Sequence, residues 1–441
     1  MAYPALDGWL RRRMELPEDA PLPTPEAVRR WQFGRIAATV GHAHAHSPFY
    51  RDRLANIPFV VNGGFPAGPG ELEILPRMSA EDLRTTPERL LCASRDEVAR
   101  VVTLQSSGTT GEPKRVFYSA GDLERTTDFF ANGMRFLADP GDAVLVLLPG
   151  ERPGGVARML CEALGRFGAR GLAHGPVEDP DATVDGMLDE DVRSIVGSPA
   201  HVNTLARAWA ARGLPRDRVR SVLLCWDMVP NAVAANLRAA FGCRVLRHWG
   251  MVETGLGGAV ECDDGSGMHL READLFVEIT NPETGRNVPA GEVGEIVVTT
   301  LSRRAMPLIR YRTGDLARLL PAPCPCGSPL RRLGQVLGRL DDVSEFSLAA
   351  LNEALYAVEG IADFTASLEQ GAAPVLRLRL SARHPEAVNR ALDAAGAIPA
   401  VRSRLRAGTL RLAAENVARG GPAEPGLAKR RLHQLEPDDS K

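Results

Sequence analysis

The sequence is poor in lysine. Of its 53 basic side chains, three are lysines, at positions 114, 429 and 441, and the other 50 are arginines. An arginine guanidinium is a broad planar fork, whereas a lysine ammonium is a compact point charge, so the two do not substitute for one another in a tight anionic pocket. A lysine retained in such a chain is therefore a candidate for a task that arginine cannot perform. The alternative is a codon-usage bias toward arginine, in which the three lysines remain by chance.

The sequence also lacks an excess of charge, a long apolar run and a disulfide pattern. The formal net charge is −2, so no basic field favours nucleic acid or an anionic membrane, and we expect neither as a partner. No apolar run approaches about 18 residues, and residues 1–20 contain no apolar targeting segment. Seven cysteines, an odd number in a long chain, do not suggest a disulfide framework, so we expect a reducing, cytoplasmic location.

The length of 441 residues exceeds what one hydrophobic core usually supports, so we expect at least two domains. Between residues 100 and 260, short apolar runs alternate with amphipathic stretches, which indicates a mostly parallel sheet covered by helices. After residue 342 a new pattern of helices and strands forms a compact α+β unit of about 100 residues. We predict an α/β protein with a large N-terminal domain (residues 1–341) of mixed and parallel sheets and a small α+β C-terminal domain (residues 342–441).

The segment richest in chemical groups is Ser106-Ser107-Gly108-Thr109-Thr110-Gly111-Glu112-Pro113-Lys114. Its glycines let the backbone approach a ligand closely, its hydroxyls donate hydrogen bonds, and its lysine supplies a point charge. This is the chemistry of a polyphosphate cradle, although the lysine does not follow the last glycine directly as it does in the Walker motif. A flexible surface turn rich in serine, threonine and glycine is the alternative.

Two acidic residues follow apolar segments further along the chain. Glu253 lies in the segment 248–255, just beyond an apolar strand, where α/β proteins place ligands and where a carboxylate could hold Mg²⁺. A solvated loop acid is the alternative. Asp315 ends the segment 311–315 and could accept hydrogen bonds from both hydroxyls of a ribose.

Three cysteines and a histidine could form a metal site. Cys262 and His269 flank one glycine-bearing turn, and Cys324 and Cys326 lie in another. Three thiols and an imidazole suit a closed, tetrahedral structural Zn²⁺ site. Because this spacing is less specific than paired Cys-x₂-Cys motifs, three unrelated reduced cysteines and a surface histidine remain the alternative.

The order and spacing of these motifs, followed by Gly338-Arg339-Leu340-Asp341-Asp342, resemble the adenylate-forming superfamily of acyl-CoA synthetases, luciferases and peptide-synthetase adenylation domains. Within it, the chain looks most like the phenylacetate-CoA ligase branch. The resemblance covers nearly the whole chain and includes residues 47–51, 81–84 and 309–315. Some relatives in this branch carry a similar set of cysteines and histidine, which supports the zinc interpretation.

The resemblance implies ATP and Mg²⁺ as ligands of the large domain. Glu253 would hold the Mg²⁺ ion, and Thr254 would contact the α-phosphate. Asp315 would bind the ribose hydroxyls, and Arg339 would reach the ribose or a phosphate. The other nucleotide-binding positions are in the phosphate loop, the strand-end motif and the adenine pocket: Ser106, Ser107, Gly108, Thr109, Thr110, Gly111, Lys114, Trp249, Gly250 and Asp227.

The resemblance also implies that the small domain is mobile, with Asp341 as its hinge. The family needs a lysine near the C-terminus that bridges the attacking carboxylate and the α-phosphate, and Lys429 lies at about the right place. A carboxylate is a weak nucleophile toward an anionic phosphorus, so catalysis requires neutralised charge and an aligned attack. The expected catalytic residues are therefore Lys429, Glu253, Thr254 and Lys114.

The implied activity is ATP-dependent conversion of a small carboxylic acid, with aromatic acids among the candidates, to an acyl-adenylate and then to a CoA thioester. The segment 343–348 leads into a helix without the glycine-containing loop that relatives making CoA esters have at this point. A carrier-protein thiol, a protein residue or an amine is therefore the alternative acceptor. An inactive nucleotide-binding sensor or scaffold is the alternative from another class, and a homodimer is the candidate assembly.

Overall fold

The computed structural model describes residues 5–104, 113–150, 152, 154–262, 264–340, 345–371, 374–418, 420–424, 426–427 and 429–435. Contacts within the chain divide it into two units. The first unit consists of Met1–Phe136 and His248–Leu340, and the second of Leu137–Arg247 and Asp341–Lys441. No helix among the described residues combines the length and the apolar composition that a membrane span requires.

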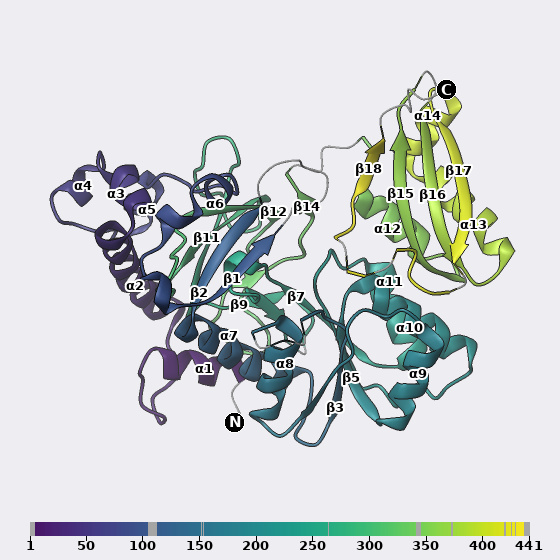
Figure 1. Cartoon of the computed structure of the whole chain (residues 1–441), viewed down its shortest axis with the longest axis horizontal. Helices are drawn as coiled ribbons and strands as arrows, with labels where there is room; N and C mark the ends of the chain where they lie inside the picture. Colours follow the sequence, from purple (N-terminus) through teal and green to yellow (C-terminus); the bar gives the residue numbers. More distant parts are fainter. Residues whose placement is uncertain are drawn as a thin grey trace. The chain divides into compact units, whose positions relative to one another are not determined.

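Helices of the first unit begin where the sequence supplies a cap. The hydroxyl of Thr24 accepts a hydrogen bond from the N–H of Ala27, and Pro25 occupies the first turn of α2. Ser119 and Asp122 form a capping box at the start of α7. The helices and 3₁₀ turns of this unit are α1 (Ala5–Arg13), α2 (Pro25–His46), α3 (Pro48–Leu54), α4 (Pro58–Val61), α5 (Pro69–Ile74), α6 (Asp82–Thr85), η1 (Pro87–Leu90), η2 (Arg95–Glu97), α7 (Ala120–Gly133), η3 (Met134–Phe136) and η4 (Val252–Thr254) (Figure 1).

The strands of the first unit pair antiparallel. β1 and β2 form a ribbon, and the order β10-β11-β12-β14 forms a second sheet. β13, β9, β8 and the end of β7 pair in that order. The bounds are β1 (Val98–Leu104), β2 (Lys114–Ser119), β8 (Ala259–Glu261), β9 (Met268–Leu270), β10 (Leu275–Thr280), β11 (Gly294–Thr300), β12 (Tyr311–Ala317), β13 (Arg332–Leu333) and β14 (Gly338–Arg339).

The second unit begins with a parallel sheet in the order β7-β6-β5-β3-β4. Helices alternate with these strands along the chain, so the α/β class predicted from the alternating apolar runs is confirmed. β7 crosses from the second unit into the first. The bounds are β3 (Ala143–Val146), α8 (Val156–Gly165), β4 (Arg170–Ala173), α9 (Pro180–Asp189), β5 (Val192–Gly197), α10 (Pro199–Ala211), β6 (Ser221–Leu224), α11 (Asn231–Phe241) and β7 (Arg244–Trp249).

The C-terminal residues of the second unit form a mixed sheet in the order β17-β16-β15-β18 (Figure 1). One hydrophobic core includes Trp209 and Phe241 of the parallel part and Tyr356 and Phe364 of the C-terminal part. The bounds are α12 (Leu348–Tyr356), β15 (Ile361–Glu369), β16 (Val375–Ala382), α13 (Pro385–Ala397), α14 (Pro399–Arg406), β17 (Arg411–Ala418) and β18 (Leu432–Leu435).

The division of the chain differs from the predicted domains, 1–341 and 342–441. One division falls between Leu340 and Asp341, but the residues after it cluster with Leu137–Arg247. Hydrogen bonds account for part of this association, because Glu353 accepts from the backbone N–H groups of Asn231 and Ala232 at the start of α11. The small, mobile C-terminal domain therefore stays a prediction.

Candidate active site

Three elements of the first unit converge on Glu253. The residue lies in η4, just beyond the end of β7, and its side chain is 1% exposed. Lys114, the first residue of β2, donates from Nζ to Oε1 of Glu253 at 2.6 Å. The hydroxyl of Tyr311, the first residue of β12, donates to the same oxygen at 2.8 Å. Lys114 of the phosphate-loop motif and Tyr311 of the segment 311–315 thus meet at the carboxylate of Glu253.

The electrostatics of this cluster keep Glu253 charged. Burial alone would raise the pKa of the Glu253 carboxyl, but the charge of Lys114 and the hydrogen bonds from Lys114 and Tyr311 together lower that pKa below its ordinary value. Burial and the negative charge of Glu253 raise the pKa of Tyr311 well above its usual range. At neutral pH the site therefore holds an ionised carboxylate beside a neutral phenol. Such a carboxylate is a suitable ligand for Mg²⁺.

Asp315 lies on β12, and both of its carboxylate oxygens accept hydrogen bonds. Trp249 at the end of β7 donates from its indole N–H at 3.0 Å, and Arg339 on β14 donates at 3.0 Å. Gly314 has a φ of +77°, and a Cβ there would lie 2.8 Å from Arg339, so a side chain would displace the guanidinium. Both partners of Asp315 are residues that we predicted for the nucleotide site.

The turn between β7 and η4 is closely packed. Gly250 admits no side chain without rearrangement, because a Cβ there would lie 2.9 Å from Cα of Gly257. The hydroxyl of Thr254 accepts from the N–H of Met251 at 3.0 Å, which fixes the 3₁₀ turn. Thr254 itself is 2% exposed. Glu253 and Thr254 therefore lie in a closely packed turn rather than in a solvated loop.

Other predicted site residues lie in the second unit or outside the described residues. The phosphate loop from Ser106 to Gly111 and the hinge residue Asp341 are outside the described residues. Lys429 is exposed and is placed beside Asp227, because the carboxylate of Asp227 accepts the N–H of Arg430 at 2.9 Å. Burial raises the pKa of Asp227, although the Arg430 N–H hydrogen bond and the nearby charge of Lys429 oppose that rise. The predicted contact of Asp227 with adenine stays a prediction.

The backbone next to Asp227 is strained. Trp226 follows β6 and has a φ of +78°, in the left-handed region that bulky side chains rarely adopt. Such a conformation costs on the order of 1–3 kcal/mol and persists where the surrounding structure fixes it. The strain lies directly after a strand of the parallel sheet, where ligands of α/β proteins bind.

The four predicted metal ligands come together in the first unit. Cys262 follows β8, His269 lies in β9, and Cys324 and Cys326 lie in the loop before β13. Their ligand atoms all lie within 4.8 Å of one another. Sγ of Cys262 is 3.7 Å from Sγ of Cys324, and Sγ of Cys326 is 3.3 Å from Nε2 of His269. Burial and the neighbouring thiols raise the pKa of Cys262, and a bound cation would reverse this effect. Three sulfurs and one nitrogen at this separation fit the ligand set of a structural zinc ion.

Sequence reasoning missed the role of Tyr311. Tyr311 belongs to the segment 311–315, in which the sequence predicts a role in ligand binding for Asp315 alone. Alternate residues of a strand share a face, so Tyr311 and Asp315, four residues apart, were candidates to point the same way. That periodicity could have placed the phenol near the site. Its contact with Glu253 required the fold, because 58 residues separate the two.

The site and fold define an α/β protein with a buried carboxylate at a strand end, next to a lysine and to an aspartate held by tryptophan and arginine. A family model described as AMP-binding enzyme matches residues 78–302, and the chain belongs to this family. Its sequence is 34% identical over 340 residues to the phenylacetate-coenzyme A ligase of Thermus thermophilus, covering 75% of this chain and 74% of that enzyme. The corresponding ligase of Pseudomonas putida is 30% identical over 72% of each chain. The branch is therefore that of the phenylacetate-coenzyme A ligases.

The fold has a solved counterpart. The crystal structure of 2-hydroxyisobutyryl-CoA ligase in the postadenylation state, in complex with 2-HIB-AMP, matches with a TM-score of 0.76. The match covers 96% of this chain and 94% of that one at 20% sequence identity. This likeness concerns the fold alone and agrees with the predicted adenylate-forming architecture.

Proposed function

We propose that the protein is an AMP-forming carboxylate–CoA ligase. A carboxylic acid attacks the α-phosphorus of ATP, the bond to pyrophosphate breaks, and an acyl-adenylate forms. The thiol of CoA then attacks the acyl carbon and releases AMP. The observation that carries the proposal is the buried Glu253 carboxylate, held by Lys114 at 2.6 Å and by Tyr311 at 2.8 Å in a chain of this family.

The site residues Glu253, Lys114 and Asp315 would each assist the attack on phosphorus. Mg²⁺, when bound, would neutralise phosphate charge, and Glu253 would hold it. Lys114 already lies against Glu253 and would move its ammonium to the phosphates when the metal takes its place. Asp315 would exchange hydrogen bonds from Trp249 and Arg339 for those of the ribose hydroxyls. Lys429 would supply the second ammonium.

Aromatic acids are the substrate class to test first, because the relatives from Thermus thermophilus and Pseudomonas putida are named phenylacetate-coenzyme A ligases. The same names support CoA as the acceptor. A carrier-protein thiol or an amine would use the same first step, so the two half-reactions have to be measured separately.

The test is a screen of aromatic, short aliphatic and amino acids. Exchange of labelled pyrophosphate into ATP, dependent on an acid, reports adenylation, and AMP release dependent on CoA reports the thioester step. We expect both with at least one aromatic acid. Exchange without CoA-dependent AMP release would assign another acceptor. ATP binding without exchange for any acid would support the sensor or scaffold.

We also propose that Cys262, His269, Cys324 and Cys326 hold one structural Zn²⁺. The support is the convergence of their ligand atoms within 4.8 Å. The expected measurement is one equivalent of zinc in the purified protein by elemental analysis. The Cys324→Ser variant should retain much less. A wild-type protein purified with zinc in the medium and containing none would refute this site.

A further inference from the structure

One buried arginine has no oxygen partner within the described part of the chain. The buried arginines among the described residues are Arg11, Arg271, Arg303, Arg310 and Arg332. Four of these donate to carboxylate or backbone carbonyl oxygens. Arg303 is the exception: it is 9% exposed, and its Nη1 is buried without a hydrogen-bond partner among the described residues. A guanidinium carries five N–H donors and keeps its charge at any pH at which the protein folds.

The Arg303 guanidinium lies beside the strand-end motif of the candidate active site. Its central carbon is 4.9 Å from the centroid of the Tyr118 ring, on β2. A Cβ placed on Gly255 would lie 3.4 Å from Nη2 of Arg303 and 3.3 Å from Nη1 of Arg271. Gly255 directly follows Thr254, the residue predicted to contact the α-phosphate. Because Arg271 is already paired with Asp274, the second guanidinium leaves an excess of positive charge here.

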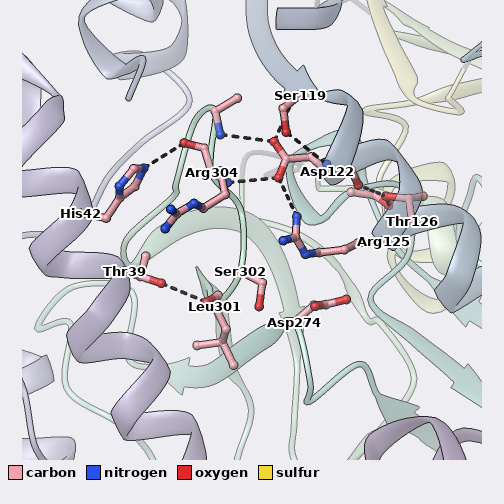
Figure 2. A network of polar contacts seen from close by, with 12 residues as sticks. Thr39, His42, Ser119, Asp122, Arg125, Thr126, Asp274, Leu301, Ser302 and Arg304 are labelled. Atoms are coloured by element: carbon pink, nitrogen blue, oxygen red, sulfur yellow. Dashed lines mark hydrogen bonds and ion pairs between the residues drawn. The ribbon is translucent and has the colours of Figure 1, made fainter. Parts of the chain in front are cut away.

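The backbone on both sides of Arg303 is fixed by buried polar groups (Figure 2). The carboxylate of Asp122 accepts the N–H groups of Arg304 at 3.1 Å and Ala305 at 3.3 Å, and also caps α7. On the other side, the hydroxyl of Thr39 in α2 donates to the carbonyl of Leu301 at 3.1 Å. The backbone that carries Arg303 is therefore anchored on both sides.

A buried cation without an anion is unfavourable, because the interior does not replace the hydration that the charge loses. The stacking on Tyr118 offsets part of this penalty. Functional sites commonly retain such unfavourable groups when a ligand supplies the missing interaction. We propose that Arg303 is an anion-binding residue of the active site, the counter-ion for a carboxylate or phosphoryl group bound beside Thr254 and Gly255. The identity of that ligand as an acid or ATP rests on the proposed function.

The test compares three variants. Arg303→Gln removes the charge and keeps hydrogen-bonding groups, Arg303→Lys keeps the charge, and Arg304→Gln is the matched control because Arg304 is the adjacent, exposed arginine. Two quantities are measured: the Tm without ligand and with ATP, pyrophosphate or the acid, and the KM of ATP and of the acid in pyrophosphate exchange. The hydrogen bond from the backbone N–H of Arg304 to Asp122 involves no substituted side chain, so every variant retains the groups that form it.

We expect Arg303→Gln to keep or raise the ligand-free Tm while raising the KM of one anionic ligand about tenfold or more, as the loss of a charged hydrogen bond would. Arg303→Lys should recover part of that affinity, and Arg304→Gln should change neither quantity. An increase confined to the acid assigns the carboxylate, and an increase confined to ATP and pyrophosphate assigns the phosphoryl group.

A structural arginine would give the opposite result. If Arg303→Gln lowers the ligand-free Tm and leaves every KM and every ligand-induced Tm shift unchanged, the proposal is wrong. If none of the acids tested supports pyrophosphate exchange by the wild-type protein, the proposed function fails instead. The Tm shifts with ATP and pyrophosphate then still decide whether Arg303 binds an anion.

Discussion

Replacing Lys114 with methionine should reverse the pH dependence of stability that Glu253 contributes. In the wild-type protein the pKa of Glu253 is lowered below its ordinary value of 4.5, so its contribution is present above that pH and is lost as the pH falls through the lower, folded-state pKa. Burial is the largest single effect on this carboxyl, so without Lys114 we expect it to outweigh the remaining hydrogen bonds, including that from Tyr311, and to raise the pKa above 4.5. The folded state then holds a proton that the unfolded state has released. The stability of the variant should therefore fall as the pH rises.

The magnitude follows from the position of Glu253. Its side chain is 1% exposed, so the stranded carboxylate has little access to water and escapes by binding a proton. At pH 7, protonating a carboxyl of ordinary pKa 4.5 costs about 3.4 kcal/mol, from about 1.4 kcal/mol per pH unit. This figure is an upper limit for the stranded carboxylate. For a unit of this size, each kcal/mol lowers the Tm by about 2–4 °C.

The assay is thermal unfolding of four proteins at pH 5.5 and pH 7.5: the wild type, Lys114→Met, Glu253→Gln and the double variant. We expect Lys114→Met to lose up to about 1.4 kcal/mol per pH unit between the two conditions, relative to the wild type. The double variant removes both charges, so its stability should not show this additional decrease with rising pH. If Lys114→Met follows the wild-type pH dependence, then Lys114 is not the group that keeps Glu253 ionised, and the electrostatic reasoning fails.

Three further predictions follow from other contacts. Lys429→Ala should depress pyrophosphate exchange by orders of magnitude and leave thioester formation from supplied acyl-adenylate largely intact; equal loss in both half-reactions would mean that another group performs this role. Removing zinc with a chelator should lower the Tm, whereas the zinc-free Cys324→Ser variant should show no further decrease. Arg310→Met breaks a buried pair with Glu278 and should cost about 3–5 kcal/mol in urea unfolding, and adding Glu278→Gln should restore part of the loss.

The sequence allowed the fold class to be predicted because the alternation of apolar runs and amphipathic stretches is a local property. β5 and β6 are short and fully or almost fully buried, and each is followed by an amphipathic helix. The association of the C-terminal residues with Leu137–Arg247 could not be predicted in the same way. It depends on pairs such as Asn203 and Ala362, whose 2.8 Å hydrogen bond joins residues 159 positions apart.

The residues of the site could be predicted from the sequence, but the contacts between them could not. Glu253, Asp315 and Lys114 were recognised because each lies in a dense motif with a chemical rationale. That Lys114 would neutralise Glu253 required the spatial meeting of β2 with the end of β7. Arg303 gave no signal at all, because an arginine beside another arginine is ordinary in a chain with 50 of them. Only burial distinguishes it from Arg304.

The contacts around Lys429 define what movement of the predicted C-terminal domain would require. Arg430 pairs with Asp363, and its guanidinium lies 4.6 Å from the ring centroid of Phe364, so the segment carrying Lys429 is anchored to its own sheet. Among the described residues, its links to the parallel part include the N–H of Arg430, which donates to Asp227, and the carbonyl of Gly426, which lies 3.0 Å from Nε2 of His201. The contacts with Asp363 and Phe364 would travel with the domain. Water can replace each of the two links to the parallel part at a net cost of about 0.5–1.5 kcal/mol, or more at Asp227, where the acceptor is charged. Asp227 and His201 would then hold the segment of Lys429 in one position of the domain and release it in another, which is the behaviour that a lysine needed in only one of two half-reactions requires.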